Sequence, residues 1–409
     1  WRKKFEVDAS LCCSVMGMKR LPWFALVCVV MLLGKVTFCH VRSTLMPNMQ
    51  ETQLLLVQWQ TIAAQMAFQV VAVLGLGLAW LTVVLGAGQI ASAQSAFTRV
   101  ASIARSLGLL WLIVLAAAWP ALLERTGNVL GPMLLAIVVV LLITEAVIYR
   151  AAQVRALSFR RLAGVAVALA YSLALALVVL AESWMNTPAG AALVDGRFQV
   201  VRWLDLIQTT GFVQAYAATL LAALVLVVSW VQYGAPITGV GSETVSSRVR
   251  TPLTALAMAA LVALLWLLTQ SLPQSASFYG VLMGQAGDSA ASLLVRLTLV
   301  LWLLTMAGLL VSLTDRQFQL SNRTLGGLMK MPIVTAPLFW VLAWWQINGA
   351  AKHATVAGLP VADLVSTQPV WVLAIGCLLV GGVVLVALRL LMGLLLGSSQ
   401  VSPSEVEHD

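Results

Sequence analysis

The sequence predicts an all-α fold, a polytopic membrane bundle of about nine helices with a possible signal or anchor helix in front of it. Two observations predict this fold. Of the 409 residues, 61% are hydrophobic and 10% are charged, which is too apolar for one water-soluble core. The apolar residues also gather in stretches of roughly 20, the length at which a helix crosses a bilayer. In lipid, an open structure must be helical to satisfy its own backbone hydrogen bonds.

The stretches follow one another with short connections, so no separate soluble domain is expected. We predict a transmembrane helical domain over residues 51–397. Its spans are expected at residues 66–88, 106–123, 129–149, 162–183, 211–232, 252–272, 292–314, 331–349 and 370–396.

The two ends of the chain differ from the part between them. Residues 1–50 contain Lys19 and Arg20 ahead of an apolar run, which is typical of a signal or signal-anchor segment. Internal methionines leave open whether this segment is retained, cleaved or mis-annotated. Residues 398–409 are rich in serine and acidic residues, so we expect a disordered tail.

The net charge of +9 does not indicate nucleic acid as a partner, because the basic residues are scattered over short loops. Of the basic residues in the loops between the spans, most lie in the loops after the first, third, fifth and seventh spans. The opposite loops hold only Arg125, Arg197, Arg202 and Lys352. This bias places the first set in the cytoplasm, so the core begins outside and the C-terminus is cytoplasmic.

Three motifs, taken in order, resemble subunit I of the cytochrome bd oxygen reductases. Residues 131–146 resemble the family's third helix, where two acids line a proton entry path. Residues 182–188, followed by 196–198, resemble its outer loop with a Trp-Met-Gln-Asn-Pro sequence. Residues 344–363 resemble the eighth helix and its exit. The resemblance implies the topology of that subunit, a prokaryotic cytoplasmic membrane and a place in a respiratory complex.

The departures from the family concern its haem ligands. The first-helix histidine of the family falls on Phe68, the fifth-helix histidine on Ala217 and the seventh-helix methionine on Thr298. The eighth-helix glutamate falls near Gln346 and Ile347. Iron in a porphyrin needs an axial lone-pair donor, and none of these residues supplies the lost ligand.

A count of histidines agrees with these departures. The chain has only His40, His353 and His408, the first and last of which lie in the terminal segments. His353 is expected at an outer helix end as a solvated, capping or polar-contact residue. We therefore predict that this chain binds no haem or other cofactor and no metal, and that it has no catalytic residue.

Glu145 is a single carboxylate within an apolar stretch of about twenty residues, 129–149. Ionisable groups in hydrocarbon usually mark a proton path or a partner contact. Glu145 matches the more inward of the family's two channel acids, whereas the other position has become Ile137. The alternative is that Glu145, about 7 Å along the helix from Arg150, extends to the inner surface. Both interpretations remain open.

Three further charged residues lie near the outer ends of predicted spans. Arg296 matches a family arginine beside a haem propionate, and without haem we expect it to reach the headgroups or contact a partner. Glu182 and Asp205 flank the outer loop and are predicted to be ordinary solvated boundary charges.

These observations predict a haem-poor, non-catalytic subunit that packs against a haem-bearing cytochrome bd-type subunit in membrane lipid. Its interior is expected to be filled by side chains such as Phe68, Tyr216 and Trp302, or by lipid. Glu145 supplies a possible proton path. The alternatives are a membrane transporter or permease-like protein and an oxidase assembly scaffold.

Overall fold

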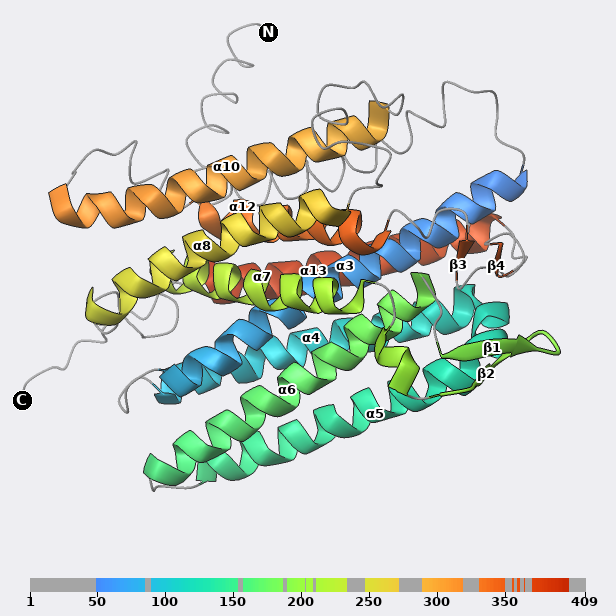
Figure 1. Cartoon of the computed structure of the whole chain (residues 1–409), viewed down its shortest axis with the longest axis horizontal. Helices are drawn as coiled ribbons and strands as arrows, with labels where there is room; N and C mark the ends of the chain where they lie inside the picture. The colour runs from blue at the N-terminus through green and yellow to red at the C-terminus, as the bar shows by residue number, and fades with distance from the viewer. Residues whose placement is uncertain are drawn as a thin grey trace, which may run out of the picture.

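The computed structural model shows a bundle of long helices that lie roughly side by side (Figure 1). The structure describes residues 49–84, 90–153, 157–186, 190–202, 204–208, 211–233, 247–271, 289–318, 331–349, 355–356, 359–360, 364 and 370–396. Residues 1–48 and 397–409, which hold most of the predicted N-terminal segment and the whole predicted tail, lie outside this description.

Within the described ranges, the first half of the chain forms four helices and the second half forms five, with short strands between some of them. The helices of the first half are α3 (Met49–Val84), α4 (Ile90–Ala118), α5 (Pro120–Gln153) and α6 (Leu157–Asn186). The second half contains α7 (Phe212–Tyr233), α8 (Ser247–Ser271), α10 (Ser289–Phe318), α12 (Pro332–Trp344) and α13 (Val370–Leu396).

Eight helices within the described ranges are long and apolar enough to cross a membrane. The predicted all-α, polytopic membrane fold is thereby confirmed. The eighth predicted span, 331–349, is a shorter apolar helix, because α12 ends at Trp344 and continues as the π-helical segment η4 (Trp345–Gly349).

Helix α3 is the central helix of the bundle. Of its apolar window, 83% is buried, against 17% for α13. It packs against α4, α6, α7, α12 and α13. Its side chains therefore decide what the interior of the bundle contains.

Helix α3 begins well before the predicted start at residue 66. Gln60 and Gln65, which precede that predicted start, are both buried. The amide of Gln60 donates to the Leu373 carbonyl oxygen, and that of Gln65 donates to Glu182. These side chains have partners inside the bundle, so the helix continues through them.

The chain passes from α4 to α5 through a single residue, Trp119, whereas the sequence predicted one span up to residue 123 and another from 129. Pro120 explains the break, because a proline is favoured at the first position of a helix and disfavoured inside one. The Trp119 indole Nε1–H donates to the Thr61 hydroxyl at 2.7 Å. This hydrogen bond ties the junction to α3.

A β-hairpin follows α6 and was not predicted. Strands β1 (Ala191–Val194) and β2 (Arg197–Val200) pair antiparallel. Asp195 and Gly196 form the two-residue turn, and both have positive φ, 51° and 76°. A two-residue hairpin of this kind favours an Asp-Gly sequence. Figure 1 places the hairpin at the same end of the bundle as β3 (Thr355–Val356) and β4 (Leu359–Pro360), and we call it the hairpin end.

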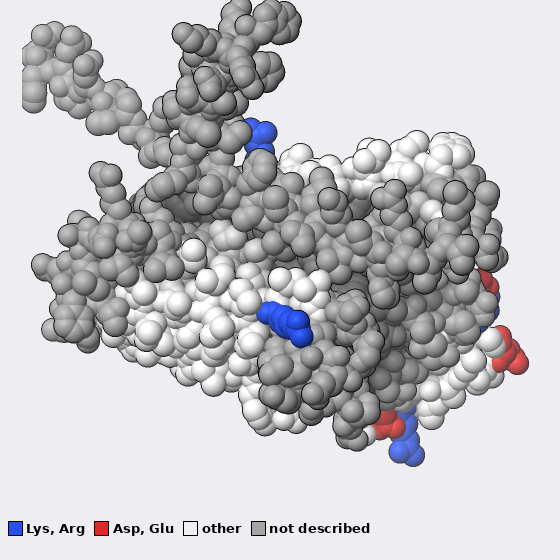
Figure 2. All heavy atoms as spheres, turned by 90° about the horizontal axis from the view of Figure 1, so that it is seen from above, with Lys and Arg blue, Asp and Glu red and all other residues white. Residues whose placement is uncertain are grey.

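The described surface carries few charges, as expected for a protein that faces lipid. Figure 2 shows one face of the molecule, on which uncharged residues cover most of the described area and the charged side chains stand apart. Large apolar side chains such as Ile113, Leu135 and Leu378 are exposed on the helices. In a membrane these side chains contact lipid or another chain.

Helices α3 and α7 approach closely at Gly77. A β-carbon at this position would lie 2.7 Å from Cβ of Val227 and closer still to the carbonyl oxygen of Ala223. Real β-carbons do not approach so closely, and a backbone oxygen within a helix cannot turn aside. Only glycine therefore fits at this crossing.

We predict that Gly77→Ala forces α3 and α7 apart and lowers the free energy of unfolding by about 1–3 kcal/mol, the usual effect of overpacking. Gly127→Ala in α5 is the matched control, because a β-carbon there meets no atom within 4 Å. Thermal unfolding in detergent measures both. Equal stability of the two variants would contradict the close crossing.

Candidate functional site

Phe68 lies on the inner face of α3 and is buried. Its ring stacks on Trp111 of α4, with ring centroids 5.9 Å apart and planes 7° apart. The ring also covers Gly108, where a β-carbon would lie 3.1 Å from Phe68 Cε2. Phe68 is thus held by α4 and presents no lone-pair donor to the interior.

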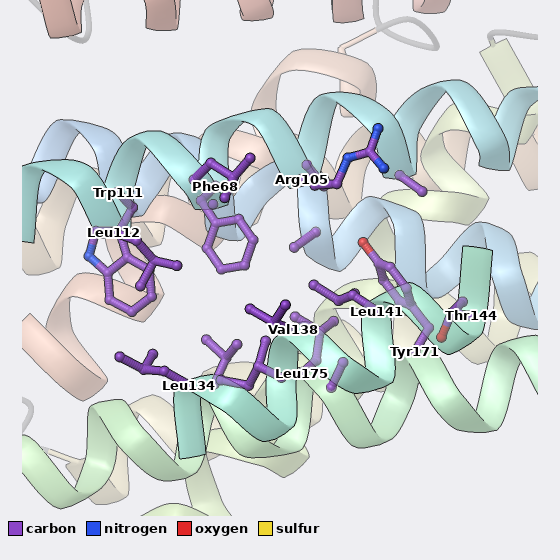
Figure 3. Close-up of a pocket in the computed structure, with 18 of the residues that line it drawn as sticks. Phe68, Arg105, Trp111, Leu112, Leu134, Val138, Leu141, Thr144, Tyr171 and Leu175 are labelled. Atoms are coloured by element: carbon purple, nitrogen blue, oxygen red, sulfur yellow. The ribbon is translucent and has the colours of Figure 1, made fainter. Parts of the chain in front are cut away.

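A cavity of about 260 Å³ lies beside Phe68, between α3, α4, α5 and α6. Ile137, at the position of the family's second channel acid, lies in its wall and makes it more apolar. Arg105, Thr144 and Tyr171 are its polar lining residues, and Figure 3 shows them gathered toward one end, with Trp111 at the other.

The cavity lies near the outer surface of the bundle. Leu109 of α4 and Leu142 of α5 line it while being 53% and 58% exposed. The space between these helices therefore opens toward the membrane. An apolar lining of this kind suits a hydrocarbon chain better than a polar molecule.

Thr298 is buried in α10 and is hydrogen-bonded in both directions. Its hydroxyl donates to the Leu294 carbonyl oxygen at 2.7 Å and accepts from the Gln346 amide at 2.8 Å. The structure thus joins Thr298 to Gln346, the residues at the resembled methionine and glutamate positions. Their polar groups satisfy each other.

Ala217 is half-buried in α7 and offers only a methyl group. The adjacent Tyr216 stacks on Phe212 and donates its hydroxyl to the Ser172 carbonyl oxygen at 3.2 Å. In the neighbouring part of the bundle, Trp302 Nε1–H donates to the Leu261 carbonyl oxygen at 2.8 Å. Aromatic side chains with local partners therefore lie in this region.

Phe68, Ala217 and Thr298 lie in three different helices, α3, α7 and α10. Phe68 contacts α4, and Thr298 contacts η4. Tetrapyrrole binding requires donors directed at the iron, and a phenyl ring, a methyl group and a paired hydroxyl do not fit that requirement.

The other predicted polar positions are only partly described. Glu145 lies in α5, near the end at Gln153, and its side chain is outside the described part of the structure. Arg296 is exposed on α10. His353 lies outside the described residues.

The prediction for Glu182 was wrong. This residue is 0% exposed and lies in the interior of the bundle. The amides of Gln65 and Gln69, on α3, both donate to its Oε1 atom, at 2.7 and 2.8 Å. One signal in the sequence pointed to this cluster: Gln58, Thr61, Gln65 and Gln69 recur at helical spacing and so share one face.

Asp205, by contrast, lies near the surface. It is half-buried in the short 3-10 helix η2 (Leu204–Gln208) at the hairpin end. Its backbone N–H donates to the Arg202 carbonyl oxygen at 3.2 Å.

Fold and site together define a polytopic helical membrane protein whose resembled ligand positions hold no iron ligand. The model of the family "Cytochrome bd terminal oxidase subunit I" matches residues 56–292, more than half of the chain. The chain therefore belongs to the cytochrome bd oxidase subunit I family, and the predicted resemblance is confirmed.

A solved structure agrees at the level of the fold. The bd oxidase from Geobacillus thermodenitrificans matches with a TM-score of 0.65 and 13% sequence identity, over 85% of this chain and 99% of that chain. No curated protein sequence matches. At 13% sequence identity the solved structure shows only that the fold is shared. The chemistry of this chain must be inferred from its own residues.

We predict that Thr298 and Gln346 are energetically coupled. In a double-mutant cycle of Thr298→Val and Gln346→Leu, we expect a coupling of about 0.6 kcal/mol, the average for side-chain hydrogen bonds between membrane helices. Thermal unfolding measures it. Thr269→Val is the control, because its hydroxyl is exposed and bonds within α8. Additive effects of the two substitutions would contradict the pairing.

Proposed function

We propose that this chain is a haem-poor, non-catalytic subunit of a cytochrome bd-type oxidase complex, packed against a haem-bearing subunit. One observation carries the proposal: the resembled ligand position Thr298 is occupied by a hydroxyl that is already paired with Gln346. Phe68 and Ala217 add a ring and a methyl group at the other two positions. Haem iron is held by axial ligand atoms, and these three positions supply none. The haem groups of the complex are therefore assigned to the partner subunit.

The membrane-facing surface supports the packing role. Helix α13 exposes Trp371, Leu378 and Leu379, and a β-carbon at Gly381 or Gly382 would meet no atom within 4 Å. Small residues allow the backbones of two membrane helices to approach closely. Family membership favours a place in an oxidase over the transporter alternative, because the family is one of oxidase subunits.

The proposed location is the prokaryotic cytoplasmic membrane. The excess of Arg and Lys in alternate loops supports a cytoplasmic C-terminus and a hairpin end on the outer side. In this orientation, Glu145 lies toward the cytoplasmic end of α5. Protons that the partner subunit consumes in reducing oxygen would enter from this end.

Haem analysis tests the proposal. We expect the purified chain alone to contain far less than one haem per chain and to give no haem bands in reduced-minus-oxidised spectra. The complex purified from native membranes should give these bands, and Phe68→Leu should leave its haem content unchanged. Stoichiometric haem ligated by this chain's own side chains would refute the proposal.

A second test concerns Glu145 as a proton-path residue. We expect Glu145→Gln to slow oxygen consumption by the complex roughly tenfold, equivalent to about 1.4 kcal/mol of barrier, because the amide cannot pass on a proton. Glu124→Gln is the control, since Glu124 is exposed and paired with Arg197 at the hairpin end. Unchanged turnover would instead assign Glu145 to the membrane surface.

A further inference from the structure

We propose that Glu182 is a proton-binding site in the interior of the bundle, reached from the hairpin end along the polar face of α3. The ligand is a proton exchanged with water. The proposal does not depend on whether haem resides on this chain or on a partner. It also concerns the opposite end of the bundle from Glu145.

The first argument is the placement of the carboxyl group. Glu182 is 0% exposed and lies one turn before the end of α6. Its Oε1 atom accepts two amide hydrogen bonds, from Gln65 and Gln69. A carboxyl group inside a membrane bundle is expensive, and such residues usually belong to proton or ion paths.

The second argument is a set of buried polar atoms near the carboxyl group in the fold. Gln69 is 1% exposed, and its Oε1 atom has no hydrogen-bond partner. Ser183, the residue after Glu182, is buried, and its Oγ atom also has none. Buried acceptors in native proteins are normally paired, so these oxygens point to a donor such as water or the proton of a carboxylic acid.

The glutamines fit both charge states of Glu182. A glutamine amide donates through its nitrogen to a carboxylate, and it accepts through its oxygen from a carboxylic acid. Rotation of the Gln69 amide by half a turn exchanges these roles without moving α3. Loading then consists of one proton joining one carboxylate oxygen, and release is the reverse.

The third argument is the route. Gln58, Thr61, Gln65 and Gln69 lie on one face of α3 over about 16 Å of helix. Gln58 and Thr61 are half-buried, whereas Gln65 and Gln69 are buried, so the polar face leads inward from the hairpin end. The Thr61 hydroxyl accepts from Trp119 and donates to the Val57 carbonyl oxygen.

Few charges surround the cluster. Residues 52–84 of α3, η4, β3 and all of α7 contain no Asp, Glu, Lys, Arg or His; Tyr216 is the titratable residue on the first turns of α7. The charged residues on the remaining elements that pack against α6 near this end are Glu124, Arg125 and Asp205. Lys352 and His353 follow η4 and lie outside the described residues.

Infrared difference spectroscopy of the complex in lipid nanodiscs, as a function of pH, tests the proposal. We expect a carboxyl C=O stretching band that grows as the pH falls and shifts in D₂O. Glu182→Gln should abolish this band. Glu124→Gln should leave it in place, because Glu124 is exposed. Thr61→Val, which interrupts the polar face, should slow the exchange of the band in D₂O.

A carboxyl band that is unaffected by Glu182→Gln would overturn the proposal. A Glu182 side chain that keeps one charge state at every pH at which the complex stays folded would also overturn it. If Glu182→Gln fails to fold, Gln69→Leu decides the question in its place. Loss of one amide donor must shift the frequency and midpoint of the band, and an unshifted band would refute the site. Haem content is measured separately, so failure here is distinct from failure of the oxidase proposal.

Discussion

Lipid cannot hydrogen-bond to a polar group, and the rest of this structure follows from that constraint. It acts most strongly on α3, the helix with the largest buried share. This helix carries several glutamines; Gln60 donates to α13, and Gln65 and Gln69 donate to Glu182 of α6. The helices that surround α3 are therefore positioned by polar contacts as well as by close packing at Gly77.

Hydropathy was sufficient to predict the fold class because each span satisfies its own backbone and differs from a loop in composition. Glu182 was mispredicted for a physical reason. Its burial depends on amides contributed by α3, more than a hundred residues away in the sequence. Hydropathy within one window cannot detect a partner on another helix. The same limitation placed the start of α3 at residue 66 instead of Met49.

The candidate site was also predicted only in part from the sequence. The resemblance located Phe68, Ala217 and Thr298 and identified each as a residue without an iron-binding atom. It did not predict that Thr298 bonds to Gln346, or that Phe68 stacks on Trp111, because both contacts join separate helices. The cavity beside Phe68 was also beyond sequence reasoning, since its walls come from four separate helices.

The bond between Thr298 and Gln346 has an evolutionary consequence. A thioether at position 298 would leave the Gln346 amide without its acceptor in an apolar interior, so that change alone is destabilising. A change at position 346 alone removes a donor and supplies no iron ligand from α10. A route from this sequence to one with an iron ligand at position 298 therefore passes through a less stable intermediate, or it changes residues 298 and 346 together. The hydrogen bond between Thr298 and Gln346 therefore favours retention of both residues, because a substitution at either position depends on the residue at the other.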